Sequence, residues 1–591
     1  MTDDSSIFTS IIQEDGSLPA RGYSDVYAHP VLISRPTETA LWPSLTLRSD
    51  ITDSQAETLC EGDPLIYSEE EIPVRIFYVD TNIDYNTVQT GSKEQPFNSL
   101  QKILHNETIE CLCSASCCSA TKVVVKIRGP INDVIIGNCQ NTSTCVNFNG
   151  NLLLEPWDTE KVVVNYKSKS YVCRLISSIH GVVFRNFEIN LVAEKEGSYS
   201  CFNNMHSCFF VNCIINFEFR DASGSSDILF VDAFSDCDQC RFVKTVVLLK
   251  DIDSRLHLFS YAFIRAYSSS CLAYDCTFEF FVNNTKGKPL EHMSNVWFDN
   301  CNSALLAASH INIIVNCHLG SMGLFEGYLE TPPTLNLNGF AASFAYDINV
   351  QTTLNVIDWE IDATIVAVAI YDNDRYSKSQ AYGDTISINT EISADSGSDE
   401  LSNTLEYIGI WSGDGFLKNV DVRLNADKIS NAATLHVEGI HAVQKIINSI
   451  VQNCDIYLNL NNIYPTTYFG WLNRNYIYGI ANINEYPEIM DVIIKINANI
   501  IVTKEKNRSD LRVYGLYGNF ATVAGGPIAN LTATASVNLN TSAVDTDDIY
   551  AFVYYCWTNL DLSDICYNVT HDDSICIEIP DSGYCKSFKC F

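Results

Sequence analysis

Short apolar strands separated by turns recur along most of this chain. Between Val123 and Leu319, segments such as HGVVFRNFEI (180–189) and SCFFVNCII (207–215) alternate apolar and polar residues, and each leads into a turn with Asn or Asp. Asn and Asp tolerate the left-handed backbone of a tight corner. Repeated corners imply stacked corners, and we predict that Asn186, Asn212, Asp275, Asn300 and Asn316 hold equivalent corner positions.

A cysteine follows most of these corner residues. Stacked corners would place the residues that follow them above one another in the interior, namely Cys213, Cys276, Cys301 and Cys317. Two interpretations stay open for these cysteines: small buried hydrophobes, since free Cys packs well inside proteins, or partners in disulfide bonds.

The second half carries a clearer repeat, in which a small residue precedes a hydrophobic one. The anchors are Gly339-Phe340, Ala369-Ile370, Gly409-Ile410, Gly439-Ile440, Gly479-Ile480, Gly515-Leu516 and Ala551-Phe552, at separations of 30, 40, 30, 40, 36 and 36 residues. Periods of this size indicate a repeat architecture. With two or three short strands per period, a β-solenoid fits better than a propeller, whose blades need four strands. We expect the Tyr or Ile residues before the anchors to stack along the axis.

The segment from Ile76 to Leu104 precedes these repeats. A strand from Ile76 to Val79 ends at Asp80, and Gly91 and Pro96 punctuate the following loop. Leu100, Ile103 and Leu104 then fall on one face of a short helix, which needs an apolar surface beneath it.

In order and spacing, this segment resembles the start of the pectin-lyase-like right-handed parallel β-helices. The shared features are a strand ending in Val-Asp, the Gly91-Ser92 pair before Pro96-Phe97, and an amphipathic cap with Ser99 and Leu100. The resemblance covers about thirty residues and carries no catalytic residue with it. It implies an all-β chain, a right-handed parallel β-helix (β-solenoid) of about fifteen coils with a short N-terminal capping helix.

We expect five regions along the chain. They are an extended acidic N-terminal arm (1–72), a strand and helix cap with a Cys-rich loop (73–122), a β-helix with Asn- and Cys-rich coils (123–330), a β-helix with Gly-Ile anchored repeats (331–555) and a Cys-rich C-terminal cap (556–591). The cap would cover the open strand edge at the end of the coil. The alternative for the arm is a loosely ordered tail.

The charge narrows the set of partners. Lys and Arg total 37 against 71 Asp and Glu, which gives a net charge of −34, and no basic stripe is present. Nucleic acid and anionic membrane surfaces are therefore not expected as partners. The acidic coat mainly keeps a large β-rich protein soluble.

The cysteines bear on the compartment. Seventeen of the 23 lie between Cys60 and Cys317, and five lie from Cys556 onward, a density that suggests an oxidising environment. The N-terminus has no basic and apolar stretch typical of a secretory signal, and no apolar run is long enough to span a bilayer. Three alternatives remain: the mature form of an exported protein, export by another route, or a virus particle protein oxidised in the cytoplasm. We expect an extracellular, cell-surface or particle-surface location.

Two cysteine motifs need a separate interpretation. In CLCSASCC (111–118), the adjacent Cys117 and Cys118 cannot easily serve one zinc tetrahedron, so disulfides in a loop are favoured. Cys237 and Cys240 form a CxxC pair without the βαβ context of a thioredoxin-like site.

Enzyme motifs are scarce. The resemblance implies catalysis or sugar binding on the exposed side of one sheet and its corner loops, but Asn-Thr-Asp and Arg-Ile-Lys elements are absent and His180-Gly181 stands alone. If the chain is an enzyme, the best candidates are Asp372, Asp374 and Arg375 in YDNDRY, which could also bind calcium or a uronate. The alternative is a polar turn.

Two extra segments accompany the 40-residue periods. They begin at Ser393 and at Tyr464, about 24 residues past their anchors, and the equal offset predicts one shared corner, two coils apart. The second supplies the candidate binding residues Tyr464, Tyr468, Trp471, Arg474 and Tyr476. Aromatic rings stack on sugar faces and also anchor protein partners, whereas the alternative is that they cover an exposed coil edge.

These features favour a non-enzymatic β-helical surface or particle protein, such as an adhesin, fibre or coat component, that binds glycans or other protein copies. The rival hypothesis is a polysaccharide lyase or glycoside hydrolase acting on acidic polysaccharide. We expect glycans or surface proteins as partners, with self-assembly as a further option, no nucleic acid and no membrane insertion. No cofactor motif is present in the sequence. Calcium is the one ion that the candidate residues of YDNDRY could bind.

Overall fold

The structure is a computed structural model of the whole chain. It describes residues 74–83, 88–113, 122–137, 146–168, 170, 172–194, 197–219, 228–238, 240–252, 258–265, 270–284, 292–299, 303–307, 309–319, 334–340, 344–346, 348–359, 364–371, 380–382, 386–394, 403–412, 416–442, 450–465, 474–484, 488–502, 509–519, 528–541, 549–553, 566–571, 576–578 and 588–590. The predicted arm (1–72) therefore lies outside the described residues.

The described chain is all-β, and nearly all of its strands pair in parallel. It divides into two compact units, the first comprising residues 1–251, 261–279 and 297–310 and the second 252–260, 280–296 and 311–591. Within the described residues the only helices are α5 (Leu100–Leu104) and α6 (Glu107–Cys113). This arrangement is compatible with a solenoid and confirms the all-β prediction.

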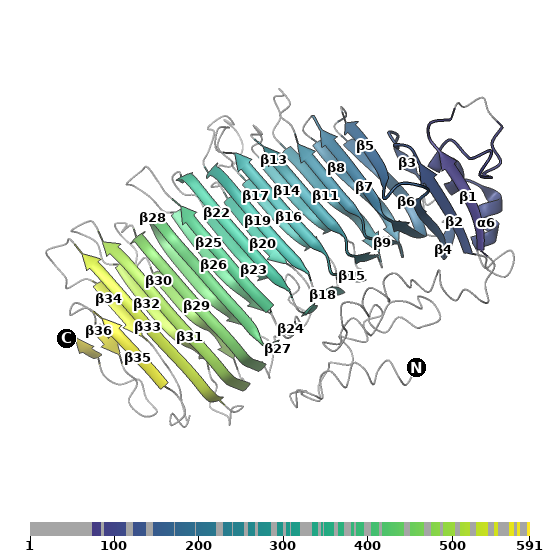
Figure 1. Cartoon of the computed structure of the whole chain (residues 1–591). Helices are drawn as coiled ribbons and strands as arrows, with labels where there is room; N and C mark the ends of the chain where they lie inside the picture. The colour runs from purple at the N-terminus through teal and green to yellow at the C-terminus, as the bar shows by residue number, and fades with distance from the viewer. Residues whose placement is uncertain are drawn as a thin grey trace. The chain divides into compact units, whose positions relative to one another are not determined.

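In the first unit the strands form three rows (Figure 1). The first row holds β3 (Ile135–Ile136), β6 (Val172–Arg185), β8 (Gly197–His206), β11 (Ile228–Asp238) and β14 (Leu258–Arg265). The second holds β1 (Val74–Asp80), β2 (Lys122–Arg128), β4 (Asn147–Pro156), the end of β6, β9 (Phe209–Val211), β12 (Arg241–Val243), β15 (Ser270–Tyr274) and β18 (Ser303–Ala307). The third holds β5 (Val162–Ser168), β7 (Phe187–Ala193), β10 (Ile214–Phe219) and β13 (Val246–Ile252).

The second unit repeats the three rows. The first row holds β17 (His292–Asp299), β20 (Thr334–Phe340), β23 (Thr364–Tyr371), β26 (Asn403–Ser412), the end of β28 (Val420–Ala442), β30 (Arg474–Asn484), β32 (Ser509–Asn519) and β34 (Ile549–Val553). The second holds β21 (Phe344–Tyr346), β24 (Gln380–Tyr382), β27 (Phe416–Lys418) and the start of β29 (Ile450–Pro465). The third holds β16 (Thr277–Asn284), β19 (His310–Leu319), β22 (Asn349–Trp359), β25 (Ile386–Ala394), the start of β28, the end of β29, β31 (Glu488–Val502), β33 (Ile528–Thr541) and β35 (Cys566–His571). An antiparallel pair, β36 (Cys576–Glu578) and β37 (Phe588–Cys590), follows.

Pairing in register explains the spacing of the repeats. Up to β27 a strand generally pairs with the strand three positions later, as in β20 with β23 and β23 with β26, so three strands complete one repeat. From β28 onward a strand pairs with the strand two positions later, as in β29 with β31 and β30 with β32, so two longer strands complete one repeat. A repeat of three short strands and their turns needs 30 to 40 residues, which agrees with the spacing of the anchors.

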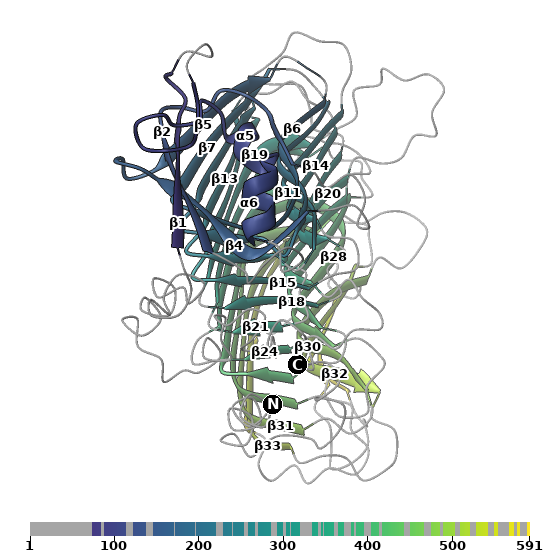
Figure 2. The same cartoon turned by 90° about the vertical axis from the view of Figure 1, so that its right-hand side faces the viewer.

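The segment before the repeats folds as the pattern predicts. β1 ends at Asp80, and Ser99 caps α5 by accepting a hydrogen bond from the backbone N–H of Gln101. Leu100, Ile103 and Leu104 are buried. The two helices contact β2, β3 and β4 and cover the end of the first unit's interior (Figure 2).

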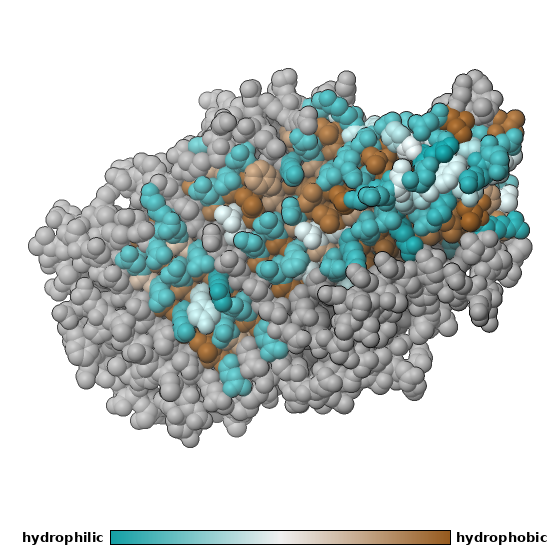
Figure 3. All heavy atoms as spheres, in the orientation of Figure 1, coloured by the Kyte–Doolittle hydropathy of each residue, from teal (hydrophilic) through white to brown (hydrophobic). Residues whose placement is uncertain are grey.

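Aromatic rings stack along the interior of the first unit. Phe184, Phe210 and Phe242 come from paired positions of β6, β9 and β12, and their ring centroids lie 5.2 and 5.1 Å apart. Phe202 and Phe234 form a second stack at 5.2 Å. Hydrophobic residues are also visible between hydrophilic ones on the surface shown in Figure 3, so outward positions are not uniformly polar.

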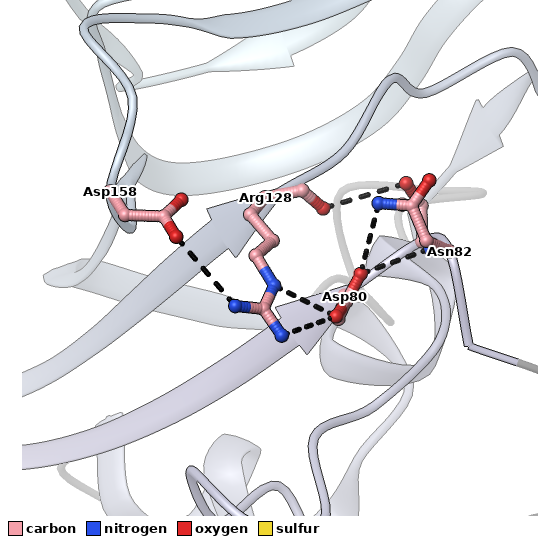
Figure 4. A network of polar contacts seen from close by, with 5 residues as sticks. Asp80, Asn82, Arg128 and Asp158 are labelled. Atoms are coloured by element: carbon pink, nitrogen blue, oxygen red, sulfur yellow. Dashed lines mark hydrogen bonds and ion pairs between the residues drawn. The ribbon is translucent and has the colours of Figure 1, made fainter.

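Asp80 joins the ends of the first two strands. Arg128, at the end of β2, donates from Nε to Asp80 Oδ2 at 2.8 Å, and Asn82 donates its backbone N–H to Oδ1 at 3.0 Å (Figure 4). The guanidinium of Arg128 also lies 4.0 Å from the ring of Trp157. Both carboxylate oxygens are thus engaged by the protein, so we interpret this network as structural.

The predicted corners are confirmed at three positions. Asn186, Asn212 and Asp275 have φ of 56°, 51° and 51°, and Asn212 donates from Nδ2 to Asn186 Oδ1 at 2.6 Å. Lys244 holds the same place in the intervening repeat with φ 48°, which the sequence pattern did not reveal. Asn316 is a wrong prediction, because it lies inside strand β19, and Asn300 lies outside the described residues.

The cysteines after these corners are buried thiols. Cys213 donates from Sγ to the carbonyl of Phe184 at 3.4 Å, and Cys276 donates to the carbonyl of Phe242 at 3.4 Å. Cys317 is also buried and free, although it lies within β19 and not after a corner, and Cys301 lies outside the described residues. The expectation of disulfides is wrong for Cys113 of the CLCSASCC motif, which is a free buried thiol in α6.

We predict that these thiols react only after unfolding. Burial raises the pKa of Cys213 and of Cys317 to about 12, so neither forms the reactive thiolate at neutral pH. Iodoacetamide should leave both unmodified in the folded chain and label both in denaturant without reductant, as measured by peptide mass spectrometry. Failure to label them in denaturant until reductant is added would show that they are oxidised.

A column of glycines confirms the anchors at the centre of the second unit. Ile410 pairs with Ile440 and Ile440 with Ile480, which stacks the glycines that precede them. A Cβ at Gly439 would lie 2.6 Å from the carbonyl oxygen of Gly479. The anchor at Ala551 is wrong, because Ala551 pairs with Leu511, four residues before Gly515.

Candidate functional site

The two long segments share a corner, as the sequence predicts. The residues between β25 and β26 and those between β29 and β30 both connect the third row of strands to the first. The end of β28 pairs with β26 on one side and with β30 on the other, so the segments are two repeats apart. Both segments therefore connect the same two rows of strands, on either side of the repeat that contains the end of β28.

Five residues on one face of β26, β28 and β30 form what we call the His–Glu–Tyr cluster. Glu406 of β26 pairs with His436 of β28, and His436 pairs with Tyr476 of β30. Two positions further along the strands, Glu438 pairs with Tyr478. Since side chains alternate between the two faces of a strand, all five project to the face opposite the buried Val437 and Ile477.

Glu438 is a carboxylate within a buried apolar column. Its neighbours in register are Ile408 and Tyr478, which are 1% and 5% exposed, and Glu438 itself is 0% exposed. Ile408 and Tyr478 therefore lie in one column, as expected for residues before the anchors, but Glu438 separates them, so they do not stack directly on each other. A fully buried carboxylate is unusual because desolvation of the charge is costly, so this position stands out from its column.

His436 supplies the partner of this carboxylate. Its Nε2 forms an ion pair with Glu438 Oε1, and the His436 side chain is 29% exposed. Burial lowers the pKa of His436, but the hydrogen bond to Glu438 and the charges of Glu438 and Glu406 together outweigh it, so the pKa is raised above its ordinary value. The imidazolium form is therefore favoured.

The aromatic rings enclose the imidazole. The rings of Tyr476 and Tyr478 are stacked, with centroids 5.5 Å apart and 12° between their planes. The centroid of His436 lies 6.0 Å from that of Tyr476 and 5.6 Å from that of Tyr478, the latter in an edge arrangement. The half-buried ring of Tyr476 and the partly exposed imidazole are the accessible members of the cluster.

We predict a pH dependence of stability that arises from His436. Its folded pKa is raised, so its contribution to stability is fully present below the ordinary pKa of histidine and is lost as the pH rises through the folded pKa. The melting temperature should fall as the pH rises above about 6.5, the ordinary pKa of histidine. His436→Gln should flatten this fall, whereas His206→Gln on β8 should keep it. An unchanged slope in His436→Gln would contradict the assignment.

The cluster can act in two ways. A protonated imidazole and a tyrosine hydroxyl can donate hydrogen bonds to a ligand, while the edge or face of Tyr476 can contact its apolar side. Two carboxylates and a histidine in neighbouring repeats are also the residue types of general acid and base catalysis. The sequence signal that could have revealed the cluster is Glu438, the one acidic residue that directly precedes a Gly-Ile anchor.

Of the predicted binding residues, the structure brings Tyr476 into the cluster. Arg474 begins β30 two residues earlier, and Tyr464 lies near the end of β29, but the structure describes only the backbone of these two. Tyr468 and Trp471 lie outside the described residues, and so do Asp372, Asp374 and Arg375. The ring centroid of His180 lies 5.8 Å from that of His206.

Two further properties concern metals and membranes. Among the described residues, no group of three or more His, Cys, Asp or Glu side chains is arranged to hold a metal ion. In the same part of the chain, neither helix is long and apolar enough to cross a membrane.

Comparison of the chain with protein-family models, with curated proteins and with solved structures found no match in any of the three.

Proposed function

We propose that the chain is a right-handed parallel β-helix that serves as a non-enzymatic surface or particle protein and binds glycans through the His–Glu–Tyr cluster. The three-strand parallel repeat supports the β-helix. Right-handedness is the expected hand, because connections between parallel strands of one sheet are right-handed in nearly all proteins. An adhesin, fibre or coat component would use such a scaffold for its length and regular surface.

One observation carries the glycan assignment. The ring of Tyr476 lies beside the imidazole of His436, which forms an ion pair with the buried carboxylate of Glu438. Sugars present hydroxyl groups around an apolar ring face, so a partly exposed aromatic ring with a fixed charged donor beside it matches their chemistry. Trp471 and Arg474, in and after the second segment, would extend the same surface.

A binding assay on pectins, alginates and host glycans tests this proposal. Immobilised glycans should retain the chain without being cleaved, and retention should fall at least about tenfold, or 1.4 kcal/mol, in Tyr476→Ala and in Trp471→Ala. The matched control is Tyr457→Ala, a tyrosine on the third row of strands whose ring lies 5.4 Å from the guanidinium of Arg423 and 5.1 Å from Lys495 Nζ. Equal loss in the control, or no binding to any glycan, would reject the site.

A polysaccharide lyase or hydrolase is the second candidate function. It is favoured by the position of Glu406 and Glu438, whose charges both act on His436, because glycoside hydrolysis needs two carboxyl groups in one site. Product release from any acidic polysaccharide that disappears in Glu438→Gln would support this function over pure binding. Loss of turnover in Asp372→Ala or Asp374→Ala would instead place the chemistry at YDNDRY.

A further inference from the structure

A second outer surface lies in the first unit, on the second row of strands. Leu153, Val183, Phe209 and Arg241 occupy paired positions of β4, β6, β9 and β12, and we call them the outer stripe. Each directly precedes a residue of the interior, such as Phe184, Phe210 or Phe242. Because side chains alternate along a strand, the outer stripe faces away from the interior.

The outer stripe is nevertheless buried. Phe209 is 8% exposed, and Leu153 and Val183 are less exposed still, although Ile76, in the same register on β1, is 49% exposed. Val124 and Val211 pack against the three apolar residues. Outward positions of a sheet reach this degree of burial only when another part of the molecule lies over them.

Arg241 shows what the covering group must carry. Its side chain is 5% exposed, its Nε and Nη1 have no hydrogen-bond partner, and its guanidinium lies 5.2 Å from the ring centroid of Phe209. Burial lowers its pKa to about 10, so it stays charged at neutral pH. A buried guanidinium is stable only beside an anion, because its desolvation is otherwise uncompensated.

We propose that the acidic N-terminal segment of the same chain, residues 1–72, lies over the outer stripe and places a carboxylate against Arg241. This segment holds 14 Asp and Glu residues against three Arg and no Lys, so its charge complements the guanidinium. It joins the fold at β1, whose Ile76 belongs to the same row of positions as the outer stripe. The stripe spans three strand spacings, roughly 15 Å, which a few residues of extended chain can cover.

Cross-linking in the full-length chain tests the occupant. A photoreactive benzoylphenylalanine in place of Phe209 should join to peptides from residues 1–72, in a product of monomer mass. The same group in place of Val172, which is 58% exposed on β6, should not react with that segment. Adducts of dimer mass would show a second copy on the stripe, and adducts elsewhere or none would reject the segment as the occupant. A dimer-mass adduct, an adduct outside residues 1–72 and the absence of any adduct would each overturn the proposal.

Limited proteolysis tests the charge contact. Trypsin can cut the segment after Arg21 and Arg48, whereas Pro36 blocks cleavage after Arg35. Arg241→Glu should speed these cuts at least about tenfold, the effect of losing a contact of 1.4 kcal/mol, and Arg241→Lys should have a smaller effect. Arg174→Glu, an exposed position on β6, is the control that should leave the rate unchanged. Equal rates in Arg241→Glu and the unaltered chain would overturn the proposal. If Arg241→Glu does not fold, as judged by circular dichroism, the comparison rests on Arg241→Lys and the cross-linking.

Discussion

Gly439→Ala is expected to lower the melting temperature of the chain strongly. The added Cβ would lie 2.4 Å from Cγ2 of Ile456 and 2.6 Å from the backbone oxygen of Gly479. A side chain can rotate away from such a contact, but a carbonyl held in a strand can move only if the next repeat shifts. We therefore expect a loss near the upper end of overpacking penalties, about 3 kcal/mol.

Thermal unfolding followed by circular dichroism measures the size of this effect, and amide hydrogen exchange locates it. Faster exchange should appear in β28 and β30, because these strands carry the two glycines in contact. Asp427→Ala, an exposed position on β28, is the control and should change the melting temperature little. A melting temperature in Gly439→Ala equal to that of the control would mean that the glycine column is not closely stacked.

Glu438→Leu is expected to lower the affinity of the chain for glycans while changing its melting temperature little. The new side chain would continue the apolar column between Ile408 and Tyr478, and this apolar burial offsets the lost ion pair with His436, whose partly exposed ring can give up its proton. The stability of the folded chain should therefore change little. His436 would lose the carboxylate that holds its charge, and a hydrogen bond to a charged group contributes about 1.5 to 3 kcal/mol. Glycan affinity should therefore fall by roughly ten- to a hundredfold.

The measurements are a melting curve and a glycan titration on the same preparation. Glu438→Gln keeps the shape of the side chain and removes its charge, so it should lose affinity to a similar degree and flatten the pH dependence of stability. Should Glu438→Leu unfold more easily while binding glycans as before, Glu438 would be a structural residue and the cluster would not be the binding site.

The periodic part of the fold could be predicted from local pattern. Strand alternation, the Asn corners and the Gly-Ile anchors each depend on residues close in sequence, and each recurs because every repeat meets the same steric demands. The failures have a common cause. Asn316 and Ala551 match the pattern in composition, but their places are set by the register with neighbouring strands, which composition does not encode.

The candidate site was found in part. Tyr476 was predicted from the aromatic segment, whereas Glu406, His436 and Glu438 were not, because they lie 38 to 70 residues earlier in the chain. Only pairing between β26, β28 and β30 brings them together. The cysteines after the corners were left open between thiol and disulfide, since only the distance between sulfur atoms in the folded chain separates the two outcomes.

By itself, then, the sequence of this protein determined an all-β repeat of short strands, its period, its corners and its acidic character, because alternation and turn chemistry act over a few residues. The tertiary structure decided which residues share a face: the buried Glu438 beside His436, and Arg241, whose Nε and Nη1 lack a hydrogen-bond partner, beside the ring of Phe209. The physical reason is that neighbours across parallel strands are a whole repeat apart in sequence, so their contacts depend on register and closure of the repeat.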